Sequence, residues 1–263
     1  NDAADALALA TSPSFEDFAV LMNAKARQLG LTDSHFVRPD GLDAPGEYSS
    51  ARDVTRLAIE AMKIPTVRAA VDEIADTIED GTRELHTWDD LLGVVPGVFG
   101  IKTGHTDAAG WNQVSAIRAD NTTIYATILG SPSRGQRNAD LQTLLAYGVG
   151  QYRQVNPIAA GHHYAAVTLP FGRKPLNLVA QHGLFAVVRV NEPLTQRVVA
   201  EKVISLPVHR GQVLGHIEVW SRGHLLGRRP LVASHSVAAT GLSTRLGWYA
   251  GRTVRHVVDM LTP

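Results

Sequence analysis

The sequence contains no cysteine, so none of its 263 residues can form a disulfide or supply a thiolate ligand. This excludes cysteine-based metal and redox sites, but it leaves the compartment open, because many exported proteins lack disulfides. Net charge is also absent, with 25 Lys and Arg against 25 Asp and Glu. A chain without a global field does not attract polyanions, so we expect no nucleic-acid partner.

Long apolar runs are missing as well, and none approaches the roughly 20 residues of a membrane-spanning helix. The first five residues are neither basic nor followed by the apolar core of a signal peptide, which indicates a chain that is processed or truncated at this end. None of the 11 histidines belongs to a His-Glu-x-x-His motif. We therefore expect no metal and no cofactor.

Helical spacing dominates the first part of the chain, where apolar residues recur at three- and four-residue steps. Ser14 precedes two acidic residues and is predicted to cap one helix, and Ser49 or Ser50 is predicted to cap the next. A third helical stretch follows farther along. The expected helices cover 2–29 with a break at 11–14, 50–62 and 138–152.

Between these helices the pattern changes to strands joined by short turns. Gly97 and Gly100 precede Lys102 in the first of these strands, and we expect them to let the backbone approach a ligand. Together the helices and the antiparallel meander predict an α+β layered domain over residues 1–156. The expected strands lie within 97–104, 111–117 and 122–129.

After a boundary near Pro157, short apolar stretches alternate with glycine-containing turns, which predicts a small all-β domain over 157–237. The expected strands cover 164–169, 184–190, 198–206, 214–221 and 225–233.

The chain ends, over 238–263, in an amphipathic basic helix at 241–261. One face carries apolar residues, and arginines lie mostly elsewhere. Docking on protein and binding to a membrane surface are both open for this helix. The apolar face is formed by Leu242, Leu246, Tyr249, Ala250, Val254, Val257, Val258 and Leu261.

The stretch most informative about chemistry is Lys102-Thr103-Gly104, on the first strand of the predicted meander. A Lys-Thr-Gly tripeptide alone occurs by chance in many proteins. Together with Ser-x-x-Lys and a Ser-x-Asn element, however, it is the signature of penicillin-binding proteins. The surrounding sequence resembles the low-molecular-mass D-alanyl-D-alanine carboxypeptidases over essentially the whole chain. Further matching segments are 29–36, 41–53, 211–215 and 230–233.

The resemblance implies a β-lactamase/transpeptidase-like domain that is incomplete at its N-terminus, followed by the family's membrane-proximal β-domain. Asn1 matches the asparagine of the Ser-Gly-Asn motif, so the serine of that motif and the whole Ser-x-x-Lys element would lie upstream. No Ser-x-x-Lys tetrapeptide occurs in this chain. We therefore expect the nucleophile in a missing N-terminal segment, in cis or as a second chain, and an isolated chain without activity.

The resemblance also implies a role for each matching residue in an acyl-serine reaction. Asn1 holds the substrate backbone and orders the missing serine. Lys102, Thr103 and Gly104 line the groove for the substrate's terminal carboxylate, and the amide of His105 donates to the oxyanion.

Arg137 matches the family's carboxylate-facing arginine by its offset from Leu144 and Leu145. An arginine suits this role because a guanidinium donates two parallel hydrogen bonds to a carboxylate. Arg134 competes for this role, and Arg137 could instead cap the helix at 138–152. The imidazole of His105 could likewise be a bystander.

The function implied is removal of the terminal D-alanine from peptidoglycan pentapeptides, with β-lactams as inhibitors, at the extracytoplasmic face of the cytoplasmic membrane. The alternative is a non-catalytic remnant that binds peptidoglycan or a protein partner. Transpeptidase or β-lactamase activity also stays open. Two departures from the family affect leaving-group contacts and deacylation: Asp40 stands where some relatives have histidine, and 86–92 lacks the usual asparagines.

Overall fold

The computed structural model describes residues 1–78, 81–119 and 121–261, with side chains up to residue 253. Its contacts divide the chain into two compact units, Asn1–Gln151 and Tyr152–Pro263. We expected the boundary after residue 156. It lies earlier because strand β6 (Tyr152–Ile158) pairs with β9 (Leu184–Arg189) inside the second unit.

Two contacting helices, α1 (Asp2–Thr11) and α2 (Phe15–Leu29), open the first unit, with the predicted break between them. The Ser14 hydroxyl caps α2 by accepting a 3.1 Å hydrogen bond from the amide of Asp17. The helix ends at Gly30, whose φ of 69° is a left-handed conformation that glycine adopts without strain.

The next two helices are α3 (Ala51–Ala61) and α4 (Pro65–Val71). Ser50 caps α3, because its hydroxyl accepts a 3.2 Å hydrogen bond from the amide of Asp53. We did not predict α4, which is short and begins at a proline, the residue that best tolerates a first helical position.

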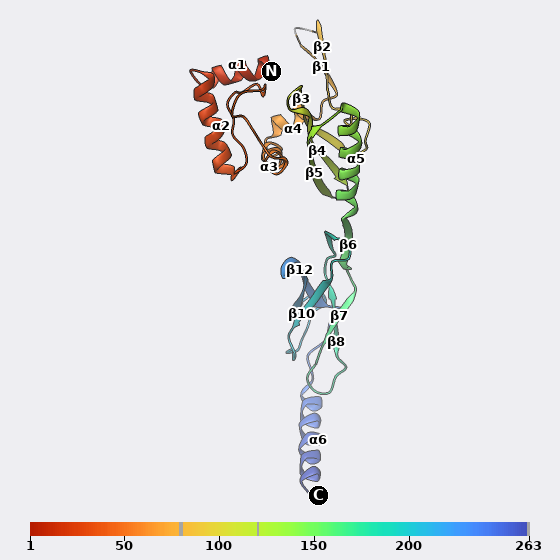
Figure 1. Ribbon diagram of the computed structural model, residues 1–263. Helices are drawn as coiled ribbons and strands as arrows, with labels where there is room; N and C mark the ends of the chain where they lie inside the picture. Colours follow the sequence, from red (N-terminus) through yellow and green to blue (C-terminus); the bar gives the residue numbers. More distant parts are fainter. Residues whose placement is uncertain (79–80, 120, 262–263) are drawn as a thin grey trace. The chain divides into compact units, whose positions relative to one another are not determined.

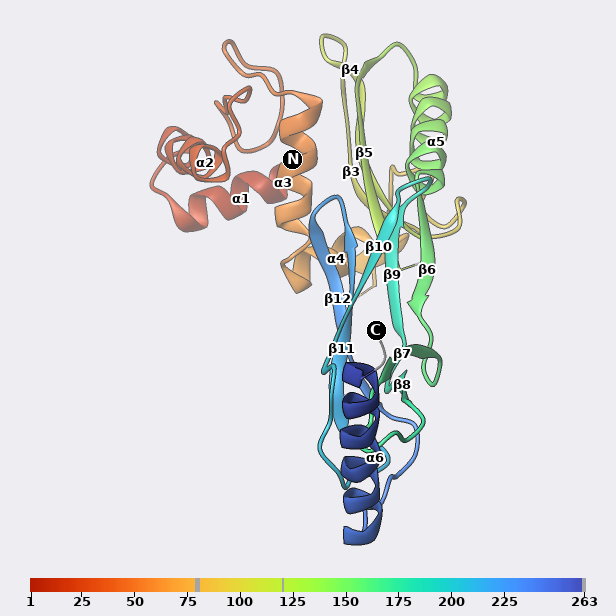
Figure 2. The same ribbon diagram turned by 90° about the horizontal axis from the view of Figure 1, so that it is seen from below.

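The sheet of the first unit contains β3 (Val98–Thr106), β4 (Gly110–Ala119) and β5 (Thr122–Ser131) in that order, all antiparallel. Helix α5 (Arg134–Gly150) covers one face, while α3 and α4 contact the other (Figures 1 and 2). Two small cores result, one under α5 around Leu141 and one facing the other helices. Within the described residues β3 is an edge strand.

At Gly97 and Gly100, where we expected the backbone to approach a ligand, the structure shows a close approach to other backbone. A Cβ on Gly97 would lie 2.5 Å from the carbonyl oxygen of Arg118. A Cβ on Gly100, where φ is 109°, would lie 2.6 Å from that of Val71. These glycines therefore allow β3 to pack closely against β4 and α4.

A hairpin that we did not predict precedes the sheet, with strands β1 (Ala75–Ile78) and β2 (Arg83–His86). Every residue of both strands is exposed, and the hairpin projects from the sheet (Figure 1). A strand with neither face buried carries no alternation of apolar and polar residues, so periodicity does not reveal it.

The second unit is an all-β body with a five-stranded antiparallel sheet in the order β10-β11-β12-β8-β7, and a separate β6–β9 pair. We did not predict β6 and β8, and the strand expected at 198–206 instead begins at Leu194 and ends at Ala200. The hydrophobic core of the second unit includes Leu176, Ile217 and Leu231. The strands not yet given are β7 (His163–Val167), β8 (Leu176–Ala180), β10 (Leu194–Ala200), β11 (Val213–Ser221) and β12 (His224–Ala233).

Helix α6 (Leu242–Leu261) closes the chain, as predicted. Among its apolar side chains Leu242, Leu246 and Tyr249 are exposed. Trp248 contacts Phe171 edge to face, with 5.8 Å between the ring centroids. The side chains of Val254, Val257, Val258 and Leu261, which we assigned to the same face, lie outside the described residues.

Candidate active site

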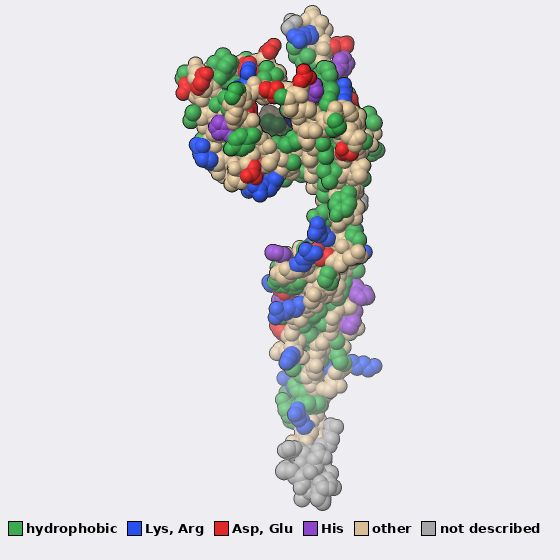
Figure 3. Space-filling view, viewed as in Figure 1, with side chains coloured by type: hydrophobic (Ala, Val, Ile, Leu, Met, Phe, Trp, Pro, Cys, Tyr) green, Lys and Arg blue, Asp and Glu red, His purple; other side chains and the backbone are tan. Residues whose placement is uncertain are grey.

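Residues that are far apart in the sequence line one pocket of about 420 Å³ in the first unit. Strand β3 contributes four consecutive residues of the lining, and its neighbour β4, the segment before the sheet, helix α5 and the start of the chain contribute one each. The space-filling view shows the first unit hollowed between its helices and its sheet (Figure 3). The lining residues are Asn1, Trp88, Lys102, Thr103, Gly104, His105, Trp111 and Arg137.

Lys102 lies on β3 opposite Val114, and its side chain remains exposed. The surrounding protein nevertheless removes part of the water from the ammonium, and this desolvation lowers the pKa of Lys102. The ammonium donates a hydrogen bond to the carbonyl of Thr103. No carboxylate pairs with Lys102 among the described residues, so its charge is available to an anion in the pocket.

His105 and Trp111 face each other at the end of the β3–β4 ladder. Their ring centroids are 4.0 Å apart. On another side of the pocket Trp88 is largely exposed, and the guanidinium of Arg134 lies 5.4 Å from its ring centroid. The aromatic rings give a polar pocket two flat apolar surfaces.

Arg137 is only 1% exposed, yet it belongs to the pocket lining. It does not cap α5, because the Ser133 hydroxyl does so by accepting from the amide of Gln136. Its Nε and Nη2 donate to Asn138 at 3.0 and 2.7 Å, and Nη2 also lies 3.3 Å from the carboxylate of Asp90. Burial lowers the pKa of the Arg137 guanidinium, which still carries its charge at neutral pH.

Arg134, the competing arginine, points its guanidinium at the same Asp90 carboxylate, with 2.6 Å from Nε to Oδ2. It does not belong to the pocket lining. Of the two arginines, Arg137 is therefore the one that faces the pocket.

Asn1 is the residue before α1, and its side chain makes no capping hydrogen bond to that helix. Asn1 is exposed and lines the same pocket as the strand-β3 residues. The start of the chain and the Lys-Thr-Gly strand therefore line one pocket.

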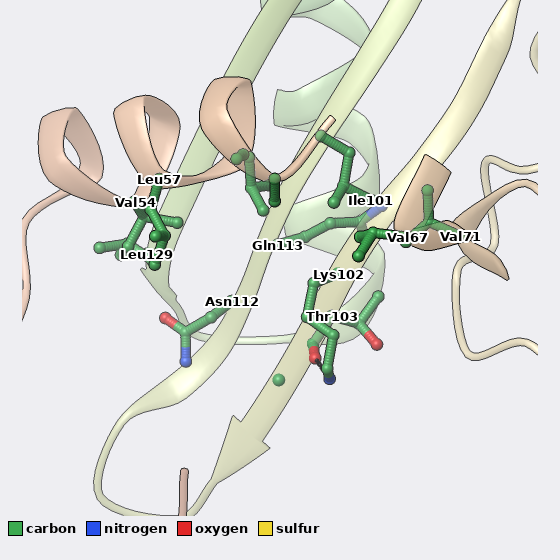
Figure 4. Close-up of a pocket in the computed structure, with 14 residues that line it drawn as sticks. Val54, Leu57, Val67, Val71, Ile101, Lys102, Thr103, Asn112, Gln113 and Leu129 are labelled. Atoms are coloured by element: carbon green, nitrogen blue, oxygen red, sulfur yellow. Dashed lines mark hydrogen bonds between the residues drawn. The ribbon is translucent and has the colours of Figure 1, made fainter. Parts of the chain in front are cut away.

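A second pocket, of about 440 Å³, adjoins the first and shares Lys102, Thr103 and Gly104 with it. Its other walls are mostly apolar side chains of α3, α4 and the sheet, with Asn112 and Gln113 of β4 as the polar members. Figure 4 shows Val54 and Leu57 projecting from α3 on one side of the strands. The remaining apolar lining is Ala58, Ala61, Val67, Val71, Ile101, Val114 and Leu129.

The described residues contain no group of three or more His, Cys, Asp or Glu side chains that could hold a metal ion. Asp40 is bound by Arg38 through two hydrogen bonds of 2.5 Å, which lower the pKa of its carboxyl group.

Sequence patterns did not identify Trp88, Asp90 and Trp111 as site residues. The signal for Trp88 and Asp90 was that 86–92 departs from the family's usual composition.

Comparison with known proteins identifies relatives of both units. Residues 1–133 match the D-alanyl-D-alanine carboxypeptidase family, and residues 152–239 match the C-terminal domain of penicillin-binding protein 5. The chain is 30% identical to D-alanyl-D-alanine carboxypeptidase DacA of Escherichia coli K12, over 90% of this chain and 60% of DacA. It is 28% identical to DacF of Bacillus subtilis 168, over 94% of this chain and 65% of DacF.

Among solved structures, penicillin-binding protein 5 of Haemophilus influenzae aligns with a TM-score of 0.59 and 26% identity, over 90% of this chain and 71% of that one. The chain spans less than two thirds of the length of the two curated relatives just described. Both units match successive parts of one architecture, an α+β domain followed by a β-domain. This chain therefore belongs to the D-alanyl-D-alanine carboxypeptidase family of serine peptidases.

Proposed function

We propose that this chain forms the substrate-binding part of a serine-type D-Ala-D-Ala carboxypeptidase, which removes the terminal D-alanine from peptidoglycan stem peptides. The observation that carries the proposal is the convergence of Asn1, Lys102, His105 and Arg137 on one pocket. Two cations in a pocket that also offers hydroxyl and amide groups suit a peptide ending in a carboxylate.

Each residue has a distinct role in this proposal. Lys102 and Arg137 attract the terminal carboxylate of the substrate, and the hydroxyl of Thr103 donates to it. The side-chain amide of Asn1 binds the substrate backbone. Because β3 is an edge strand, alternate amides turn away from β4, and we assign the amide of His105 as the donor to the oxyanion.

The reaction proceeds through an acyl-serine. The serine oxygen adds to the carbonyl carbon of the penultimate D-alanine, while a neighbouring lysine accepts the hydroxyl proton. The tetrahedral oxyanion collapses, the C–N bond breaks, and the leaving D-alanine takes a proton on its nitrogen. Water then hydrolyses the ester and regenerates the serine hydroxyl.

We assign the serine and this lysine to a segment outside the chain, joined in cis or supplied as a second chain. The 440 Å³ apolar pocket beside Lys102 supports this assignment. A helix of the outside segment that packed into this pocket would bring its serine and lysine close to the Lys-Thr-Gly strand. A pocket walled by Val54, Leu57 and Val71 is covered by apolar side chains more favourably than by water.

Labelling by a fluorescent penicillin tests the proposal. The full gene product is expected to be labelled covalently at a serine upstream of Asn1, and this chain alone is expected to stay unlabelled. Lys102→Met should slow labelling of the full product by about 100-fold. The matched control is Lys63→Met, because Lys63 is exposed and, among the described residues, its ammonium pairs only with Glu60.

Two results would contradict the proposal. Labelling of the isolated chain at one of its own serines would refute the assignment of the nucleophile. A full gene product that binds peptidoglycan fragments but is neither labelled nor hydrolytic would favour the non-catalytic alternative.

We further propose that α6 binds the extracytoplasmic face of the cytoplasmic membrane. No helix in the described part of the chain is long and apolar enough to cross a membrane. Leu242, Leu246 and Tyr249 are exposed on one face, and the guanidinium of Arg252 lies 5.1 Å from the ring of Trp248. Exposed apolar residues beside cations are typical of interfacial helices.

Sedimentation with phosphatidylglycerol-containing vesicles tests this proposal. Leu246→Asp is expected to weaken vesicle binding about tenfold or more, because it puts a charge on the apolar face. Thr244→Asp, on the opposite face, is the control and should bind nearly as wild type. Equal binding of both variants would argue against insertion of this face.

A further inference from the structure

The Asp90 carboxylate is the centre of a polar cluster beside the pocket. Its Oδ2 accepts from Arg134 Nε at 2.6 Å and from Asn138 Nδ2 at 2.7 Å, and lies 3.3 Å from Arg137 Nη2. A second hydrogen bond from Arg134 reaches Oδ1. One carboxylate thus contacts three donor side chains that α5 contributes.

Arg137 depends on this cluster for its orientation. Its Nε and Nη2 are used by Asn138 and Asp90, whereas no described residue accepts from Nη1. A guanidinium is planar, so fixing Nε and Nη2 also fixes the direction of Nη1. Because Arg137 is 1% exposed and lines the pocket, that remaining edge is the part available to a ligand.

Charge also favours this arrangement. Arg134 and Arg137 repel each other, and the negative charge of Asp90 offsets the repulsion. The guanidinium of Arg137 also lies 5.7 Å from the ring centroid of Trp111. Without Asp90, Asn138, this ring and the charge of Asp89 would remain beside a buried cation that a second cation repels.

We propose that Asp90 is a positioning residue for substrate recognition: it holds Arg137 so that Nη1 faces the C-terminal carboxylate of the peptide. This inference rests on the proposed function and adds a determinant of its specificity. Asp90 does not belong to the pocket lining, so it acts through Arg137.

The test compares two substrates of the full gene product, a peptide ending in D-Ala-D-Ala with a free carboxylate and the same peptide as its C-terminal amide. The readout is the ratio of kcat/KM for the acid to kcat/KM for the amide. Asp90→Asn is expected to lower this ratio about tenfold by weakening use of the carboxylate, with the amide reaction little changed. A general folding defect would slow both substrates together.

Three further variants sharpen the result. Asp140→Asn, an exposed acid on α5 that accepts from Gln136, should keep the wild-type ratio. Arg134→Gln should keep most of the ratio, because it leaves the Arg137 contacts in place. In an Arg137→Ala background, Asp90→Asn should cause no further loss.

A wild-type ratio in Asp90→Asn would overturn the inference, and so would a loss in Arg134→Gln as large as that in Asp90→Asn. Either result would leave the proposed function intact. If the wild-type product hydrolysed neither peptide, the proposed function itself would fail, so the two failures are distinguishable.

Discussion

The rings of His105 and Trp111 lie 4.0 Å apart between centroids, with their planes tilted by 32°, and the two residues are register partners on β3 and β4. The contact lies at the end of the ladder that carries Lys102. It therefore links the shape of the pocket to the pairing of two strands.

Removing this ring contact is expected to loosen the end of the ladder. Trp111→Ala should lower the free energy of unfolding by about 2 kcal/mol, because the ring is half-buried and its contact with His105 is lost. Trp111→Phe should lose about half as much. Urea denaturation followed by circular dichroism measures both values, and an unchanged midpoint in Trp111→Ala would refute the expectation.

Substitution by alanine should have opposite effects on stability at Gly100 and Gly135. Gly100→Ala should destabilise the protein by about 2 kcal/mol or more, because φ is 109° and the new Cβ would lie 2.6 Å from the Val71 carbonyl oxygen. Gly135→Ala, in α5 with open space around the new Cβ, should stabilise it by about 0.5–1 kcal/mol. Thermal unfolding distinguishes the two signs, and shifts in the same direction would contradict this account of Gly100.

Leu141 is expected to be a main contact between α5 and the sheet. It is fully buried, whereas Leu144 on the same helix is 39% exposed. Leu141→Ala should cost about 3 kcal/mol in free energy of unfolding. Leu144→Ala, the control, should cost less than about 1 kcal/mol. Similar losses in denaturant titrations of the two variants would show that α5 does not pack as described.

The lowered pKa of Asp90 predicts how the free energy of unfolding changes at acid pH. Hydrogen bonds from Arg134 hold the pKa of Asp90 below its ordinary value of 3.8. A carboxyl group with a lowered folded-state pKa contributes stability above its unfolded pKa and loses it as pH falls through the folded value. Asp90→Asn should therefore be less stable than wild type by about 1 kcal/mol at pH 7.

This difference should shrink below about pH 4, as the wild-type carboxylate becomes protonated. Denaturation midpoints of wild type and Asp90→Asn across pH 2–7 would reveal it. A difference that stays constant with pH would mean that Asp90 contributes by shape and not by charge.

The sequence alone determined the local features of this protein. The caps at Ser14 and Ser50, the strands around Lys102 and the closing helix follow from side-chain chemistry and short-range spacing, which act within a few residues. The Lys-Thr-Gly segment indicated the family because further segments that match the family follow in the same order along the chain.

The tertiary structure decided which distant residues meet. Only folding brings Asn1 beside Lys102, and only the packing of α5 selects Arg137 for the pocket while Arg134 remains outside its lining. Asp90 gained its role because two arginines and an asparagine converge on it. Such contacts depend on close packing between elements, which residue periodicity does not encode.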